Sequence, residues 1–97
     1  MVNAIVLLSV ARHRIGAAAE ELADLPGVTE VYSVAGQFDL VVMVRTQTNE
    51  DLADLMTDRL LKVEGILRSD TLIAFRVYSR YDLEHMFGIG MEEPPAH

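Results

Sequence analysis

The spacing of apolar residues divides the chain into alternating strands and helices. The first apolar run, residues 3–11, is short and rich in β-branched residues, which is typical of a strand. Over residues 15–25 the apolar side chains recur every three or four positions, and this spacing predicts an amphipathic helix. Pro26 and Gly27 are expected to end that helix, because proline cannot continue it and glycine tolerates a left-handed exit.

Two apolar runs in the middle of the chain predict a hairpin. Residues 28–35 and 38–46 are rich in residue types that favour strands, and a short break containing glycine separates them. Such a break predicts an antiparallel pair of strands. A second helix is expected to follow, with Thr48 or Asn49 capping its first turn through a side-chain oxygen and Gly65 ending it.

The order of these elements predicts the fold. Residues 66–79 are expected to carry a long last strand, so the order is β-α-β-β-α-β, that of the ferredoxin-like fold. This α+β fold has an antiparallel sheet with both helices on one face, because its crossovers are right-handed. Residues 1–79 are expected to form this single domain. Residues 80–97 are expected to be a C-terminal extension, with a short helix over residues 81–87 and then a flexible tail.

The central strands are apolar on both faces of the predicted sheet. Every residue of the segment 40–44 is apolar, although neighbouring residues of a strand point to opposite faces. An apolar face open to water would be larger than the patches that soluble monomers usually expose. The pattern therefore predicts a dimer in which two sheets face each other. The first predicted strand is also apolar on both faces. Ala4, Val6, Leu8 and Val10 lie on one face, and Ile5 and Leu7 lie on the other.

Composition narrows the classes of function. The 97 residues suffice for one domain, and a formal net charge of −7 disfavours direct binding to DNA or RNA. The absence of cysteine excludes disulfides, thiolate catalysis and sulfur-ligated metals. The histidines His13, His85 and His97 are isolated from one another, so neither a metal site nor a cofactor is expected. The first residues lack the basic region of a signal peptide, and no apolar run reaches membrane-spanning length, so a cytoplasmic location is expected.

The break between the two middle strands is the candidate binding site. Gly36, Gln37, Phe38 and Asp39 place a glycine, an amide, an aromatic ring and a carboxylate within four positions. Gly36 would let a ligand approach the backbone closely, free loop N–H groups could hold a carboxylate, and Asp39 could accept from an ammonium group. The same residues also fit a plain hairpin in which Gly36 makes the turn, Asp39 caps it and Phe38 packs.

The succession of these segments resembles a known family, the effector-binding (RAM) domain of the Lrp/AsnC transcription regulators. The resemblance extends over residues 3–79. Its most specific feature is the glycine-x-aromatic-aspartate loop between two strands, followed at the right distance by a helix exit and a strand bearing Ser and Thr. The segments that carry it are residues 28–35, 36–39, 40–44, 63–66 and 69–71.

The resemblance implies a binding module that modulates transcription indirectly. Members of the family carry an N-terminal helix-turn-helix ahead of this domain, and here the first strand begins at Asn3, so a stand-alone form is expected. Related domains dimerise through their sheets, assemble into rings of dimers and bind small amino acids or related metabolites where dimers meet. A full-length Lrp/AsnC regulator is an expected partner. The implied ligand-binding residues are the four residues of the loop together with Ser69, Asp70 and Thr71, and Phe38 stands where tyrosine is common.

Other interpretations of the sequence remain open. Ser69, Asp70 and Thr71 also fit the solvated start of a strand. Small ferredoxin-like dimers include enzymes of the monooxygenase and isomerase types that act on apolar metabolites. No nucleophile–base pair is visible in this sequence, so no catalytic residue is predicted. An oligomerising adaptor without a ligand is a third possibility.

Overall fold

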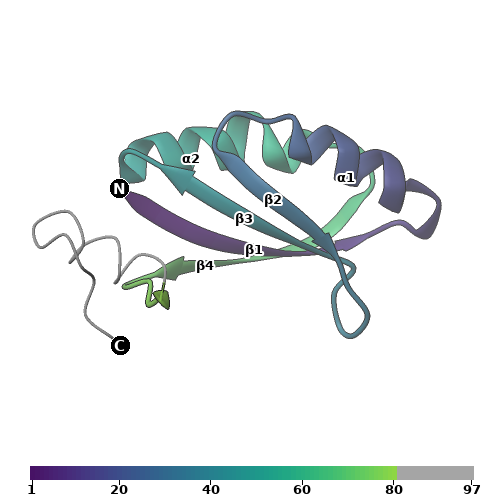
Figure 1. Cartoon of the computed structure of the whole chain (residues 1–97). Helices are drawn as coiled ribbons and strands as arrows, with labels where there is room; N and C mark the ends of the chain where they lie inside the picture. The colour runs from purple at the N-terminus through teal and green to yellow at the C-terminus, as the bar shows by residue number, and fades with distance from the viewer. Residues whose placement is uncertain (81–97) are drawn as a thin grey trace, which may run out of the picture.

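An antiparallel sheet with two helices on one face forms the domain (Figure 1). The computed structural model of the protein describes residues 1–80. The element order β-α-β-β-α-β confirms the predicted ferredoxin-like α+β fold. The elements are β1 (Val2–Val10), the 3₁₀ turn η1 (Arg12–Arg14), α1 (Ile15–Ala23), β2 (Val28–Ser33), β3 (Leu40–Thr46), α2 (Asn49–Asp58), the 3₁₀ turn η2 (Leu60–Lys62) and β4 (Ile66–Ala74).

The strand order across the sheet is β2-β3-β1-β4, and every neighbouring pair is antiparallel. β1 and β3 are therefore central, while β2 and β4 are the edge strands. Leu8 of β1 lies opposite Leu40 on one side and Ser69 on the other. This row links the start of β3 to the start of β4 across β1, so the two predicted parts of the site lie at the same end of the sheet.

The helices cover one face of the sheet and form the core with it. Alternate residues of β1 and β3 are buried under α1 and α2, which contribute Leu22, Leu52 and Leu55. The same alternation leaves the residues between them on the other face. The largest fully buried side chains are Leu8, Leu22, Leu40, Leu60, Val6 and Val42.

The turns of the chain have local causes that the sequence indicated. Thr48, rather than Asn49, is the cap of α2, because its Oγ1 accepts a hydrogen bond of 3.0 Å from the backbone N–H of Asp51. Gly27 and Gly65 each directly precede a strand. Their φ angles are positive, +99° and +104°, and residues with a side chain rarely adopt this backbone conformation. Each glycine carbonyl also accepts a backbone bond of 2.8 Å from a neighbouring segment.

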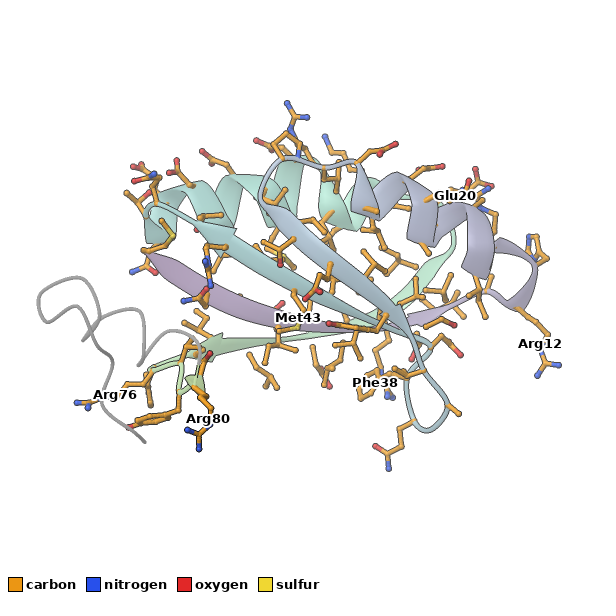
Figure 2. The ribbon with its side chains drawn as sticks, viewed as in Figure 1. Arg12, Glu20, Phe38, Met43, Arg76 and Arg80 are labelled. Atoms are coloured by element: carbon orange, nitrogen blue, oxygen red, sulfur yellow. The ribbon has the colours of Figure 1, made fainter. Side chains whose placement is uncertain are left out.

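The face of the sheet opposite the helices is rich in apolar side chains, and no helix of residues 1–80 covers it. We call it the open face, made of side chains that alternate with the buried ones: Ile5, Leu7, Tyr32, Val41, Met43 and Leu72. Figure 2 shows Met43 on the side of the sheet away from Glu20 and the helices. The expectation of strands that are apolar on both faces is thus confirmed, and the dimer inferred from them stays a prediction.

The last strand is shorter than the expected range. β4 ends at Ala74, which pairs with Asn3 near the start of β1. Phe75 follows directly and is 99% exposed. The predicted helix over residues 81–87 and the predicted tail lie outside the described residues. Within residues 1–80, no helix is both long and apolar enough to span a membrane.

Candidate functional site

The loop of residues 36–39 projects from one end of the sheet, on the side away from the helices (Figure 1). A backbone bond of 3.0 Å from the N–H of Val34 to the carbonyl of Asp39 closes its base. Gly36 has φ of +140°, and a Cβ built there would have no atom within 4 Å. Glycine is therefore favoured at this position by backbone conformation and not by crowding, and the space beside it is open.

Asp39 ties the loop to the central strand β1. Its backbone N–H donates to the carbonyl of Leu8 at 2.8 Å, and its carboxylate Oδ2 accepts from the backbone N–H of Val10 at 2.8 Å. The β1–β3 pairing ends at Leu8 and Leu40, so this carboxylate is the hydrogen-bond partner of a strand N–H beyond the ladder. Asp39 thus has a structural role, but its carboxylate accepts from β1 and not from the turn that the plain-hairpin interpretation expected it to cap. Its predicted contact with a ligand ammonium group remains a prediction.

Phe38 joins the loop to β4. The guanidinium carbon of Arg68 lies 5.0 Å from the centroid of the Phe38 ring, within the range of a cation–π contact. Phe38 is half-buried, whereas Gly36 and Gln37 on the same loop are exposed. Arg68 pairs with Ser9 in the β4–β1 ladder. Arg68 is not among the residues predicted from the sequence. No local signal marks it, because the contact crosses β1 between residues that are 30 positions apart in the chain (68 − 38).

The predicted residues at the start of β4 are divided between the two faces of the sheet. Asp70 pairs with Leu7 and shares the open face with Arg68, two positions away. Ser69 and Thr71 pair with Leu8 and Val6, whose side chains are buried under the helices. The alternation of a strand could have predicted this division from the sequence alone. The structure therefore brings the 36–39 loop together with Arg68 and places Ser69 and Thr71 on the other side.

Ser69 and Thr71 line a groove between α2 and β4, which has a volume of about 380 Å³. Its lining is largely apolar, with Leu52, Ala53, Met56, Leu61 and Ile73 beside the two hydroxyl groups and Asn49. A second depression, of about 340 Å³, lies at the other end of the open face and is lined in part by Ile5, Met43 and Arg45. The 36–39 loop borders neither of these hollows.

The charged groups of the site are not neutralised by one another. Among residues 1–78, the one ion pair is that of Arg14 with Glu21, at 3.1 Å on the helix side. Arg68 and Asp70 thus share a face without forming a salt bridge. No group of three His, Asp or Glu side chains in the described segment is arranged to hold a metal ion. Elsewhere on the open face, the hydrogen bond and negative charge of Glu30 raise the pKa of Tyr32 above its ordinary value of 10.0.

Comparison with known proteins assigns the chain to a family. The model of the Lrp/AsnC ligand binding domain matches residues 3–83. The chain belongs to this family. This membership confirms the resemblance seen in the sequence. Because the family comprises ligand-binding domains of transcription regulators, it also confirms a regulatory binding module in place of the alternative of a small enzyme.

Solved structures and curated relatives agree with this assignment. TTHA0845 from Thermus thermophilus is 46% identical, with a TM-score of 0.77 over 82% of this chain and 100% of that one. FFRP-DM1 is 36% identical, with a TM-score of 0.74 over 77% of this chain and 100% of that one. The HTH-type transcriptional regulator FL11 of Pyrococcus furiosus is 31% identical over 77% of this chain and 49% of its own length. The chain spans between 38% and 49% of the length of the curated relatives that it matches.

Proposed function

We propose that this domain binds a small metabolite, an amino acid, at the 36–39 loop and the start of β4, and that binding changes its assembly. The observation that carries the proposal is the contact of Phe38 with Arg68, which joins the loop to β4. β1 lies between the two segments in the sheet, and this contact spans it. Family membership supports a ligand in general, and the amino acid is the finer step that we propose.

The open face is the proposed surface of dimerisation. It carries apolar side chains from all strands, and Leu72 and Tyr32 on it are 51% and 47% exposed. The loop projects from the end of this face, so a second subunit packed on the face would border the loop (Figure 1). A ligand held by residues of two subunits binds the assembled state better than the free subunit and therefore favours assembly.

Sedimentation velocity tests both parts of this proposal. The protein is measured alone and with a mixture of the twenty amino acids. We expect a dimer or larger species whose distribution shifts when the amino acids are added. A monomer at all concentrations would contradict dimerisation through the open face. A distribution that no amino acid changes would contradict the proposed ligand class.

Two matched pairs of variants locate these effects. Gly36→Val forces a side chain onto a φ of +140° and should abolish the response to amino acids. Gly16→Val, at an exposed position of α1 where no atom lies within 4 Å of a built Cβ, should keep that response. Leu72→Glu places a charge on the open face and should weaken dimerisation. Leu61→Glu, at a residue that is 43% exposed on the helix side, should not.

A regulator that carries a DNA-binding module is the proposed partner. Curated relatives of the chain are named HTH-type transcriptional regulators. A domain of this family would reach DNA by assembling with such a protein through the same surfaces, since its own net charge of −7 does not attract phosphates. Co-purification of the chain with a tagged full-length regulator, lost in Leu72→Glu, would support this partner. Equal recovery of both forms would contradict it.

A further inference from the structure

We propose that Arg68, held against the ring of Phe38, binds the carboxylate of the ligand and makes a carboxylate a requirement of the site. This inference rests on the proposed function, because it assigns a specificity-determining residue to the same loop. Arg68 is not one of the ligand-binding residues predicted from the sequence. The inference also changes the role expected of Asp39, whose carboxylate already accepts from the backbone of β1.

The contact with Phe38 positions Arg68 without using its hydrogen-bond donors. A guanidinium group has five N–H donors that lie in its plane. A ring face beneath the group attracts its positive charge and leaves these donors available for hydrogen bonds. No hydrogen bond or ion pair of Arg68 with residues 1–80 accompanies the 5.0 Å contact. The side chain is exposed on β4. Arg68 is therefore a positioned cation whose N–H donors are available. A bidentate hydrogen bond to a carboxylate requires such a group.

The neighbouring acids define the rest of the ligand. Asp70 lies on the same face two positions along β4, a spacing of about 7 Å along a strand. Asp39 lies in the loop that Phe38 belongs to. The Asp70 carboxylate on the face of Arg68 would repel a second negative charge on a ligand and would attract an amino group. The chemistry thus favours a zwitterion, with its carboxylate on Arg68 and its ammonium group toward Asp70, over a dicarboxylate or a keto acid.

A tryptophan at the site gives a direct measurement. The chain has no tryptophan, so Phe38→Trp introduces a single indole that can be excited apart from the tyrosines, and it keeps an aromatic face under Arg68. This variant is titrated with each of the twenty amino acids, and the one that changes its fluorescence most is chosen. The same titration is then made with the primary amine that lacks the carboxylate of that amino acid, and again with Arg68→Gln in the Phe38→Trp background.

We expect Arg68→Gln to weaken binding of the amino acid by about tenfold or more, since a charge-assisted bond is lost. The primary amine should bind weakly and to the same extent with and without Arg68. Arg68→Lys, which keeps the charge and loses the paired geometry, should recover part of the affinity. Arg76→Gln is the matched control, because it removes an exposed arginine at the opposite end of the sheet from Phe38 (Figure 2).

The outcomes separate this inference from the proposed function. If amino acids shift the sedimentation of the unmodified protein but Arg68→Gln binds the amino acid within twofold of the parent, the role of Arg68 is wrong and the function stands. If no amino acid changes either fluorescence or sedimentation, both are wrong. If Arg68→Gln changes the assembly of the protein without ligand as strongly as with it, Arg68 is a contact between subunits and the inference is overturned.

Discussion

The two faces of the sheet carry similar residues and differ in what covers them. Leu8 and Leu40 are 0% exposed under the helices. Leu7 and Val41, their neighbours in the same strands, lie half-buried on the open face, where Leu72 is 51% exposed. Removal of apolar surface from water stabilises a fold in proportion to the area buried. The apolar side chains of the covered face are buried within one subunit and stabilise its fold. Those of the open face are still partly exposed to water, so their burial can stabilise association.

The largest effect expected from this comparison concerns two adjacent leucines of β1. Leu8→Ala should lower the free energy of unfolding by about 2–5 kcal/mol, because it leaves a cavity in the core. Leu7→Ala should cost less for the single subunit and should instead raise the dissociation constant of the dimer. Urea denaturation at several protein concentrations separates the two contributions. Equal losses at the lowest concentration would mean that the two faces do not differ as described.

Two glycines with positive φ sharpen the comparison between a packed turn and an open loop. A Cβ on Gly65 would lie 2.7 Å from the Cβ of Arg14, whereas one on Gly36 would meet nothing within 4 Å. Gly65→Ala should therefore lower the free energy of unfolding by about 3 kcal/mol, and Gly36→Ala by about 1–2 kcal/mol from backbone strain alone. Thermal or urea unfolding checks the order. A larger loss at Gly36 would contradict the open space seen beside it.

Asp39 lies where the loop meets the covered core, and its removal should have an intermediate effect. Asp39→Ala takes away the acceptor of the Val10 N–H bond and should lower the free energy of unfolding by about 1–3 kcal/mol. Asp39→Asn keeps an acceptor oxygen and should cost less. Hydrogen exchange at the Val10 amide should quicken in the alanine variant. If both variants are as stable as the parent, the carboxylate is not structural, and its role as a ligand group regains weight.

The smallest effect is a change in titration on the open face. The Glu30 carboxylate raises the pKa of Tyr32, so Glu30→Gln should return that pKa toward 10.0, as measured by NMR of the tyrosine ring. Because the folded pKa is above the unfolded one, the contribution of this pair is present below pH 10 and is lost as the pH rises through the raised value. Glu20→Gln on the helix side is the control and should leave Tyr32 unchanged (Figure 2).

Much of the fold could be predicted because its signals are local. Helix spacing over α1, the cap at Thr48 and the glycine exits at Gly27 and Gly65 each depend on a few neighbouring residues. The apolar character of both sheet faces is likewise a property of strand alternation. The end of β4 at Ala74 had no such local signal, because the apolar alternation of the sequence continues through Phe75 and Val77.

The candidate site shows the limit of local signals. The sequence by itself determined the loop of residues 36–39, its glycine and aspartate, and the family to which the chain belongs. Only the tertiary structure decided that Asp39 bonds to Val10, that Arg68 lies over Phe38 and that Ser69 and Thr71 belong to another surface. The physical reason is the register of the sheet. It brings together residues about 30 positions apart, and no local pattern in the sequence records which side chains then meet.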